Sequence, residues 1–374
     1  LNSNSQVSTP AAIAFRSSKN ITKVIRPEDV FKYPIRFGQQ ALPLLKKNSS
    51  IGLRYINKVI GRYTQTEFHT CQLANVTELS AVSLYNYISK HSHSEGLVFV
   101  IPQFWTNEQR VAIQSACNMA SLDILTIVDD FTSISLLYGS LRNNKYRKKP
   151  KHVLFIDVGS TSTKVYGAKF SWSDDKSNVQ QTSAVWTEKC GGYYLAKALS
   201  QSLNISFNKA TKKLSQSHNT DLLPHISDVL DEFRKTIQEA MNLSIQNAGP
   251  FDEIQVTGGA SQYKFIVDVI LTTANVSYIQ RDFNANEAFA LGGVIAGLQM
   301  AEMNVYSPVY VKRLPMFDIE VECGDRVHYC TKNQKCEEVV ITNSTCSTVK
   351  MYAPQHEVPV GTLNIVAEYE MVNI

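Results

Sequence analysis

The sequence predicts an α/β protein of two lobes followed by an antiparallel β segment, and three observations lead to that fold class. Strand-like and helix-like stretches alternate between residues 97 and 141, which is typical of an α/β layer. Two apolar strands, each followed by a glycine turn, lie about a hundred residues apart. Beyond Pro308 the pattern changes to alternating, strand-like runs. With 374 residues, the chain is long enough for two or three domains.

The composition is that of an ordinary globular protein, with 44% hydrophobic residues and a net charge of +4. The densest basic patch covers residues 145–151, and we expect a solvated loop there because neither an aromatic platform nor a recognition helix accompanies it. No run of about 18 apolar residues occurs, which argues against a membrane span. The first residues are polar and the chain does not begin with methionine, so we expect a fragment or a processed chain.

The first lobe is expected to begin with a mixture of short strands and helical stretches, the latter including residues 50–62. Residues 97–101 form an apolar run that predicts a buried strand, which Pro102 ends. Thr106 is placed to cap a helix that runs to Ala120, because the apolar residues that follow it have helical spacing. A strand over residues 124–128 and a helix over 132–141 complete the alternation.

The second lobe is expected to begin after a boundary at residues 143–151. Helices are predicted after Gly191-Gly192, within the polar stretch 208–247, and over residues 261–271 and 284–300. The last of these carries Gly292, which lowers intrinsic helix stability by ~1 kcal/mol relative to alanine and therefore suggests tight backbone packing. After residue 308, strands are predicted over 317–321 and 338–341.

The first glycine turn follows the strand 153–156 and begins with Asp157. Gly159 allows a phosphate to approach the backbone closely, and the hydroxyl and N–H groups of residues 160–162 can donate hydrogen bonds to its oxygens. Asp157 could hold a metal-bound water at the end of the strand. An ordinary turn that is capped by its own carboxylate is the alternative.

The second glycine turn, Gly258-Gly259-Ala260-Ser261, follows the strand 253–256 and precedes a predicted helix whose N-terminus would offer a positive dipole. We expect the two turns to come from opposite halves of the molecule and to face each other across one crevice wide enough for an adenylate. Taken alone, each turn is also compatible with a plain loop without a ligand.

Two features point to the secretory pathway. Seven N-x-Ser/Thr sequons exceed the number expected by chance, at Asn20, Asn48, Asn75, Asn204, Asn242, Asn275 and Asn343. Four of the seven cysteines cluster near the C-terminus, at Cys323, Cys330, Cys336 and Cys346. A disulfide within this cluster is favoured over free thiols, and zinc is disfavoured because no CxxC pair is present.

Four motifs in order resemble those of the heat-shock-seventy chaperones, within the actin-like ATPase (ribonuclease-H-like) superfamily. The stretch 97–141 resembles the connecting region, and residues 157–163 resemble the second phosphate loop. Residues 258–261 resemble the adenosine motif, and 286–292 the closing helix. The resemblance covers roughly residues 9–302 and then the start of a β substrate-binding domain. It implies nucleotide-binding lobes at 1–142 and 143–302, and a partial β domain at 303–374.

Within this family, the sequence looks most like the large endoplasmic-reticulum branch, of the hypoxia-up-regulated or 170-kilodalton glucose-regulated type. The phrase at residues 53–62, the Asp-x-Gly-Ser start of the phosphate loop, and Asp130 in place of a glutamate favour this branch. The family's first phosphate loop is absent, so the domain is expected to be incomplete at its N-terminus.

The resemblance implies that Asp157 and Asp130 act in catalysis and that Asp157 binds Mg²⁺. ATP or ADP contacts are expected from Gly159, Ser160, Thr161, Ser162, Gly191, Gly192, Lys212, Gly258, Gly259, Ala260 and Gln262. For Asp130 a helix N-terminal charge, and for Lys212 a solvated helix face, explain the residue equally well.

Three departures from the family pattern predict poor hydrolysis. Asn57 stands in place of the lysine that orients the attacking water, Lys164 in place of a metal-site aspartate, and Gln262 in place of the arginine that stacks on adenine. The segment between Gly192 and Gly258 is also shorter than in the family.

The expected function is that of an ATP-binding chaperone in the lumen of the endoplasmic reticulum. It would hold unfolded polypeptide and act as a nucleotide-exchange partner of the resident heat-shock-seventy chaperone, with no nucleic-acid or membrane partner. A scaffold that binds no nucleotide is one alternative. A sugar kinase of the same superfamily is another, against which the β segment after residue 308 argues.

Overall fold

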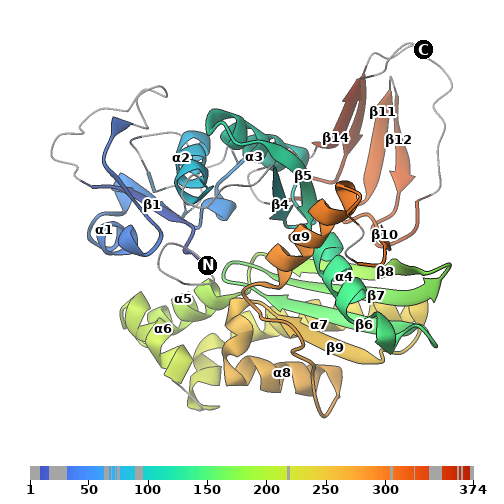
Figure 1. Ribbon diagram of the computed structural model, residues 1–374. Helices are drawn as coiled ribbons and strands as arrows, with labels where there is room; N and C mark the ends of the chain where they lie inside the picture. The colour runs from blue at the N-terminus through green and yellow to red at the C-terminus, as the bar shows by residue number, and fades with distance from the viewer. Residues whose placement is uncertain are drawn as a thin grey trace.

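A computed structural model describes most of the chain. The described residues are 9–16, 32–62, 67–68, 70–71, 73, 76–88, 96–216, 220–303, 306–323, 325–336, 348–359, 362–363 and 365–370. The fold is a mixed α/β arrangement of the actin-like ATPase type, with an antiparallel sheet at the C-terminal end (Figure 1).

The first lobe opens with a small antiparallel sheet in the order β2-β1-β3. Its strands are β1 (Ala12–Phe15), β2 (Ile35–Phe37) and β3 (Gly52–Arg54), and the helices α1 (Leu42–Lys47) and α2 (Val76–Ile88) pack nearby. The predicted helical stretch at residues 50–62 is therefore wrong. Gly52 lies against β1 so closely that a Cβ there would be 2.1 Å from the Ile13 carbonyl oxygen, and this strand pairing displaces a helix.

The strand–helix alternation that follows is confirmed. Strand β4 (Leu97–Ile101) pairs in parallel with β5 (Ile124–Asp129), and α3 (Asn107–Met119) connects them. The backbone N–H of Thr106 donates to the Gln109 side chain at the start of α3. Helix α4 (Asp130–Leu141) begins directly after β5, two residues earlier than predicted, because the Asp129 side chain caps its first turn through the Thr132 N–H.

The second lobe is built on a five-stranded sheet in the order β10-β8-β7-β6-β9. Its strands are β6 (Lys151–Val158), β7 (Thr163–Ser173), β8 (Lys176–Thr187), β9 (Glu253–Thr257) and β10 (Val309–Lys312). Strands β6, β7 and β8 form an antiparallel meander, whereas β9 joins β6 in parallel and β10 joins β8 in parallel. The segment after Pro308 thus contributes an edge strand to this sheet.

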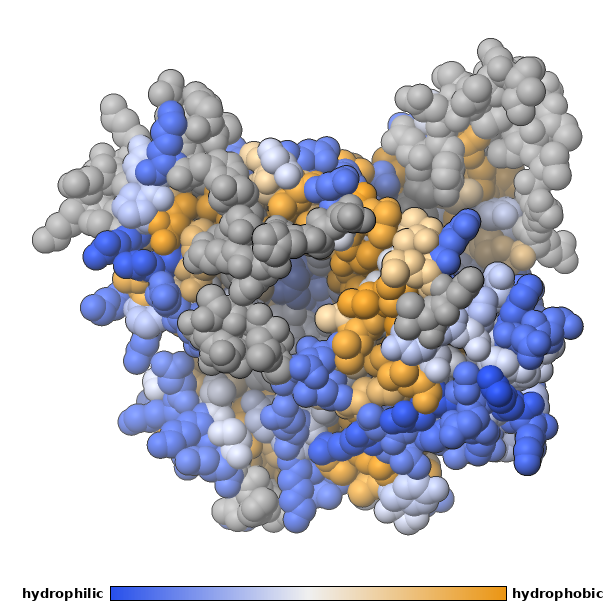
Figure 2. Space-filling model, viewed as in Figure 1, coloured by the Kyte–Doolittle hydropathy of each residue, from blue (hydrophilic) through white to orange (hydrophobic). Residues whose placement is uncertain are grey.

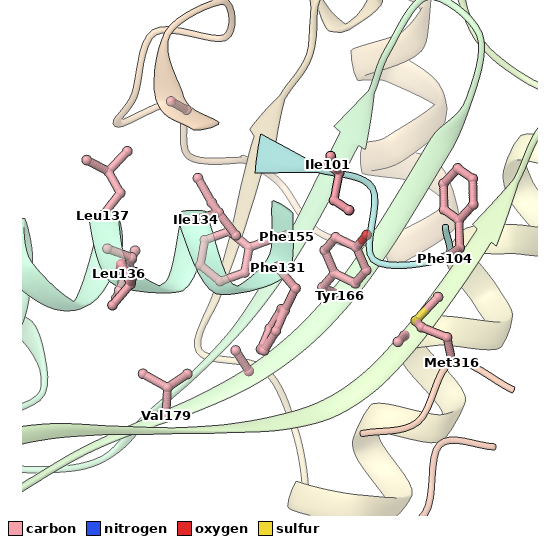
Figure 3. Close-up of a cluster of buried hydrophobic side chains, with 14 of the residues drawn as sticks. Ile101, Phe104, Phe131, Ile134, Leu136, Leu137, Phe155, Tyr166, Val179 and Met316 are labelled. Carbon is pink, nitrogen blue, oxygen red and sulfur yellow. The ribbon is translucent and has the colours of Figure 1, made fainter. Parts of the chain in front are cut away.

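Helices cover both faces of this sheet (Figure 1). The helices after β8 are α5 (Gly192–Ser202), α6 (Phe207–Gln216), α7 (Ser227–Ala248), α8 (Lys264–Ala274) and α9 (Ala288–Met300). Leu154 and Ile156 of β6 face the core made with α5, α7 and α8, whereas Phe155 faces α4. Because both faces are buried, β6 is apolar almost throughout. Figure 3 shows Phe131 and Ile134 of α4 pointing toward Phe155 and Tyr166.

Helices α4 and α9 lie side by side, and the tight packing predicted at Gly292 is confirmed. A Cβ at Gly292 would be 2.0 Å from the Ser133 carbonyl oxygen. The Ser133 hydroxyl in turn donates to the Phe289 carbonyl at 2.6 Å. Helix α9 is shorter than predicted and starts at Ala288. Its outer side leaves Leu291 and Val294 exposed, and Figure 2 shows hydrophobic residues gathered over α9 and α4 on this face.

The basic segment between the lobes is not simply solvated. Lys145 forms ion pairs with Asp282 at 2.8 Å and with Glu253 at 3.2 Å, and the Arg147 guanidinium lies over the Trp172 ring. The segment therefore attaches the end of α4 to the second lobe.

The C-terminal sheet is antiparallel, in the order β12-β11-β13-β14. Its strands are β11 (Ile319–Cys323), β12 (Asp325–Cys330), β13 (Thr348–Tyr352) and β14 (Ile365–Glu370). The predicted strand at 317–321 is confirmed from Ile319 onward, whereas the one at 338–341 lies outside the described residues. Cys330 and Cys336 form a disulfide, which confirms a pair within the cysteine cluster. Cys346 lies outside the described residues.

Candidate functional site

The two predicted glycine turns lie next to each other at one edge of the five-stranded sheet. Strands β6 and β9 are parallel neighbours with Asp157 opposite Thr257, so the turns that follow them emerge side by side. Gly258 has a φ of +88°, and a Cβ there would be 2.3 Å from Asp157 Oδ1. The expectation that the turns face each other from opposite halves is wrong, because both belong to the same sheet of the second lobe.

The first turn is held by the start of α5. The Gly159 N–H donates to the Ser162 carbonyl at 3.0 Å and closes the turn. The Gly192 and Tyr193 N–H groups donate to the Gly159 and Ser160 carbonyls, at 3.0 and 2.8 Å. The structure thus places Gly191 and Gly192 beside the turn, but the Gly192 and Tyr193 N–H groups bind the turn itself instead of remaining available to a ligand.

Donors remain on the other side of this turn. Within the described part of the chain, the backbone N–H groups of Ser160, Thr161 and Ser162 donate no hydrogen bond. Ser160 is exposed, whereas Thr161 is buried. Successive free N–H groups in a turn form the kind of concavity that binds anions.

The centre of the site is an ion-paired cluster formed by Asp130, Asp157 and Lys164, which we call the Lys164 centre. Lys164 Nζ lies 2.8 Å from Asp130 Oδ2 and 2.5 Å from Asp157 Oδ2. All three side chains are buried, with residue exposures of 3%, 4% and 8%. One ammonium group therefore bridges both carboxylates in an environment with little water.

Local sequence brings two of the three residues of this cluster together. Asp157 and Lys164 are direct cross-strand partners in the β6–β7 hairpin, whose register follows from the turn between them. Asp130 comes from the first turn of α4, which the packing against α9 holds over the same face of the sheet.

Asp130 is saturated by donors. Its Oδ1 accepts hydrogen bonds from the Tyr166 hydroxyl at 2.8 Å and from the Gln103 N–H at 3.0 Å, while Lys164 takes Oδ2. Burial by itself lowers the pKa of Lys164, but the attraction of Asp130 and Asp157 more than reverses this, and the pKa is raised above its ordinary value. Lys164 is therefore charged at neutral pH.

This arrangement does not fit Mg²⁺ at Asp157. The ion prefers carboxylates that are free to ligate it in near-octahedral geometry, and here the ammonium already lies between the two carboxylates. Within the described ranges, no group of three or more His, Cys, Asp or Glu side chains is placed to hold a metal ion. The metal at Asp157 and the catalytic roles of Asp157 and Asp130 stay predictions, and in this structure both carboxylates are paired with Lys164.

Residues of the first lobe also reach the turn. The Asn57 amide donates to Thr161 Oγ1 at 3.2 Å, and the Ser160 hydroxyl lies beside the Tyr55 hydroxyl. Burial raises the pKa of Tyr55, so that its hydroxyl keeps its proton. Asn57 thus lies beside the first turn, and its side chain carries no charge.

Of the other predicted contact residues, some lie beside the first turn and others lie on the exposed surface. Gly259 and Ala260 begin a short 3-10 helix (Gly259–Gln262) beside the first turn, where Ala260 Cβ is 3.4 Å from the Cβ position of Gly192. Gln262 is exposed at the end of this helix, and the predicted helix proper starts only at Lys264. Lys212 is exposed on α6, and the described structure records no polar contact between it and the turns.

Two functional neighbours were missed by the sequence analysis. Tyr166 follows Lys164 by two positions in β7, so the strand period places both on one face, and this spacing was a usable signal. Gln103 was not detectable, because its N–H reaches Asp130 only through the meeting of the β4–α3 connection and α4.

Comparison with known proteins finds similarity to Hsp70 proteins. The Hsp70 protein family matches residues 62–246. Hypoxia up-regulated protein 1 of Xenopus laevis is 20% identical over 86% of this chain and 60% of its own length. The proteins of the same name from Gallus gallus and Homo sapiens are 22% and 20% identical, over 86% and 76% of this chain and 39% and 37% of their own lengths.

The chain therefore spans 37–60% of the length of these relatives. No helix in the described ranges is long and apolar enough to cross a membrane. The order of the motifs, the actin-like architecture and these matches agree in showing similarity to Hsp70 proteins, and within them to the hypoxia up-regulated branch.

Proposed function

We propose that this chain is part of a chaperone that binds ATP or ADP and holds unfolded polypeptide, but does not turn ATP over. The single observation that supports the lack of turnover is the Lys164 ammonium between Asp130 and Asp157. Phosphoryl transfer in this fold depends on a metal ion and on a positioned water. Here the residues do not fit the metal, and Asn57 offers no positive charge to the water.

Nucleotide binding, in this proposal, rests on the two adjoining turns. The free N–H groups of residues 160–162 would bind phosphate oxygens, and Gly258 and Gly259 would lie against the adenosine. We expect this binding to be weak, since Asp130 and Asp157 together carry one more charge than Lys164 compensates.

The polypeptide-holding part of the proposal rests on the similarity to Hsp70 proteins and on the C-terminal sheet. Strands β11–β14 supply an antiparallel sheet of the type that holds extended peptides by strand addition. The division into lobes at 1–142 and 143–302 and a β domain from 303 is part of this proposal, although β10 (Val309–Lys312) pairs with the five-stranded sheet.

Residence in the endoplasmic reticulum, N-glycosylation and nucleotide exchange on the resident Hsp70 chaperone also belong to the proposal. All four sequon asparagines that the structure describes are exposed, which sugar attachment requires. They are Asn48, Asn204, Asn242 and Asn275.

The test combines three measurements on the purified chain. Phosphate release from ATP should not exceed the rate without protein, with or without Mg²⁺, while the chain should suppress aggregation of a heat-denatured client enzyme. In addition, the chain should accelerate the release of labelled ADP from the endoplasmic-reticulum Hsp70 protein. Sustained ATP turnover would contradict the first part, and no effect on aggregation would contradict the second.

A second candidate function is a scaffold that binds no nucleotide. It is favoured by the contacts of Tyr55 and Asn57 with Ser160 and Thr161, because first-lobe side chains already satisfy the turn's hydroxyl groups. Titration with fluorescent ATP separates the two candidates, since saturable binding supports the first and its absence supports the scaffold.

A further inference from the structure

A cavity that does not include the glycine turns lies where three parts of the chain meet. It has a volume of about 690 Å³ and is lined by the start of α3, by the segment from the end of β10 (Lys312) to Phe317, and by the C-terminal sheet. We call it the interdomain pocket. Its volume falls within the range of about 300–1,000 Å³ that is typical of small-molecule sites.

The charged residues of the interdomain pocket all have one sign. Arg110, Lys312, Arg313 and Lys335 line it, and none of the described residues that line it carries a carboxylate. Arg313 pairs with Asp129 at 2.5 Å. Within the described part of the chain, the other three form no ion pair. Three cations that form no ion pair thus converge on one cavity, with Asp129 and Asp130 near enough to Arg110 to attract its charge.

Arg110 is the most informative of these cations. Lys312 and Lys335 are exposed, so water solvates them, but Arg110 is only partly exposed and its guanidinium donates no hydrogen bond within the described structure. Burial lowers the pKa of this guanidinium, with Asp129 acting in the opposite direction. A partly desolvated guanidinium with five N–H donors and no acceptor is unfavourable unless an anion binds there.

The remaining lining is largely apolar. Trp105, Leu314 and Met316 lie on the nucleotide-domain side, and Met351 lies on the side of the C-terminal sheet. Trp105, Leu314 and Met316 are themselves buried, so they form a fixed surface. The pocket therefore combines an apolar wall with a deeply placed guanidinium and lysines at its edge.

We propose that the interdomain pocket binds a small organic anion, a carboxylate or phosphate attached to an apolar or aromatic body. Arg110 pairs with the anionic group, in the two-bond geometry that guanidinium groups form with carboxylate and phosphate, and the apolar wall holds the body. The lining residues come from α3, from the segment 312–317 and from the C-terminal sheet. The ligand therefore contacts all three parts of the chain.

The experiment uses two probes that differ only in charge. 1-Pyrenebutyrate carries a carboxylate and 1-pyrenebutanol does not, and their affinities for the whole chain are measured by fluorescence titration in the absence of nucleotide. We expect saturable binding of pyrenebutyrate that is at least tenfold tighter than that of pyrenebutanol. Arg110→Gln should weaken pyrenebutyrate at least tenfold and leave pyrenebutanol unchanged.

Two further variants serve as controls for this experiment. Lys335→Gln, at an exposed position, should weaken pyrenebutyrate severalfold without affecting the fold. Arg234→Gln, on the far exposed side of α7 where Arg234 pairs with Asp231, should change nothing. Equal affinity for the two probes, no saturable binding, or an Arg110→Gln variant that binds like wild type overturns the proposal. Displacement by an aspartate-rich peptide at equal concentration overturns the assignment to a small ligand.

Discussion

The Lys164 centre and the interdomain pocket both place basic side chains away from water, but they differ in what surrounds the charge. Lys164 has two carboxylates within 2.8 Å, and its ammonium is fully compensated. Arg110 has no acceptor among the described residues. Removing one partner of a buried ion pair leaves a charge unpaired inside the fold, whereas a cation without an ion pair is open to a ligand. The difference shows which cation of this protein is structural.

The largest expected effect comes from removing the compensated cation. Lys164→Met leaves two buried carboxylates without a counter-charge, so we expect the free energy of unfolding to fall by about 3–5 kcal/mol, as when one partner of a buried pair is removed. Urea unfolding measures it. The matched control is Lys197→Met, which breaks the exposed pair with Glu67 and should lose at most about 1 kcal/mol. Equal losses in the two variants would show that the Lys164 centre is not desolvated.

A second variant tests how α4 delivers Asp130 to the centre. Gly292→Ala places a Cβ against the Ser133 backbone, and overpacking of this kind reduces stability by about 1–3 kcal/mol, more than the gain in helix propensity of about 1 kcal/mol. Thermal unfolding should show a lower midpoint. Gly293→Ala in the same helix meets methyl groups of Val100 and Val98, at 2.9 and 3.7 Å, instead of backbone, and should reduce stability less than Gly292→Ala. A Gly292→Ala protein as stable as wild type would contradict the close α4–α9 contact.

His152 is a third buried basic group, to be compared with Lys164 and Arg110. We expect it to make the stability of the protein depend on pH. Its ring nitrogens contact the Gly249 carbonyl at 2.9 Å and the Ser244 hydroxyl at 2.9 Å, and burial lowers its pKa. As the pH falls below about 6.5, the unfolded chain takes up a proton that the folded protein resists, so stability decreases by up to about 1.4 kcal/mol per pH unit.

Urea unfolding of wild type and His152→Gln at pH 7.5, 6.5 and 5.5 checks this expectation. The variant should lose less stability than wild type between pH 6.5 and 5.5, because it cannot take up the proton in the unfolded state. Parallel pH dependences would exclude His152 as the cause.

The smallest expected effect comes from removing Arg110, the cation that forms no ion pair. Without ligand, Arg110→Met should leave the free energy of unfolding within about 0.5 kcal/mol of wild type or raise it, because no internal ion pair is lost. Differential scanning calorimetry of ligand-free protein is the measurement. A loss comparable to that of Lys164→Met would mean that Arg110 has an internal partner and would remove the contrast between the two regions.

Much of the architecture could be predicted because its signals are local. The alternation at residues 97–141, the strand before Asp157 and the glycine-dependent packing of α9 all depend on spacing or on single residues. Residues 50–62 were predicted wrongly, because pairing with β1 outweighed their helical pattern. The relation between the two turns was also wrong, since strand order in a sheet is not encoded in the spacing of its strands along the chain.

The sequence by itself determined the pairing of Asp157 with Lys164, because a hairpin with a four-residue turn sets which residues oppose each other. It also determined that Tyr166 shares their face. Only the tertiary structure decided that Asp130 completes the cluster and that Arg110 is left without an acceptor. Both outcomes depend on contacts between segments that are far apart in the chain. The packing of these segments, and not the local sequence, decides how much water remains around each charge.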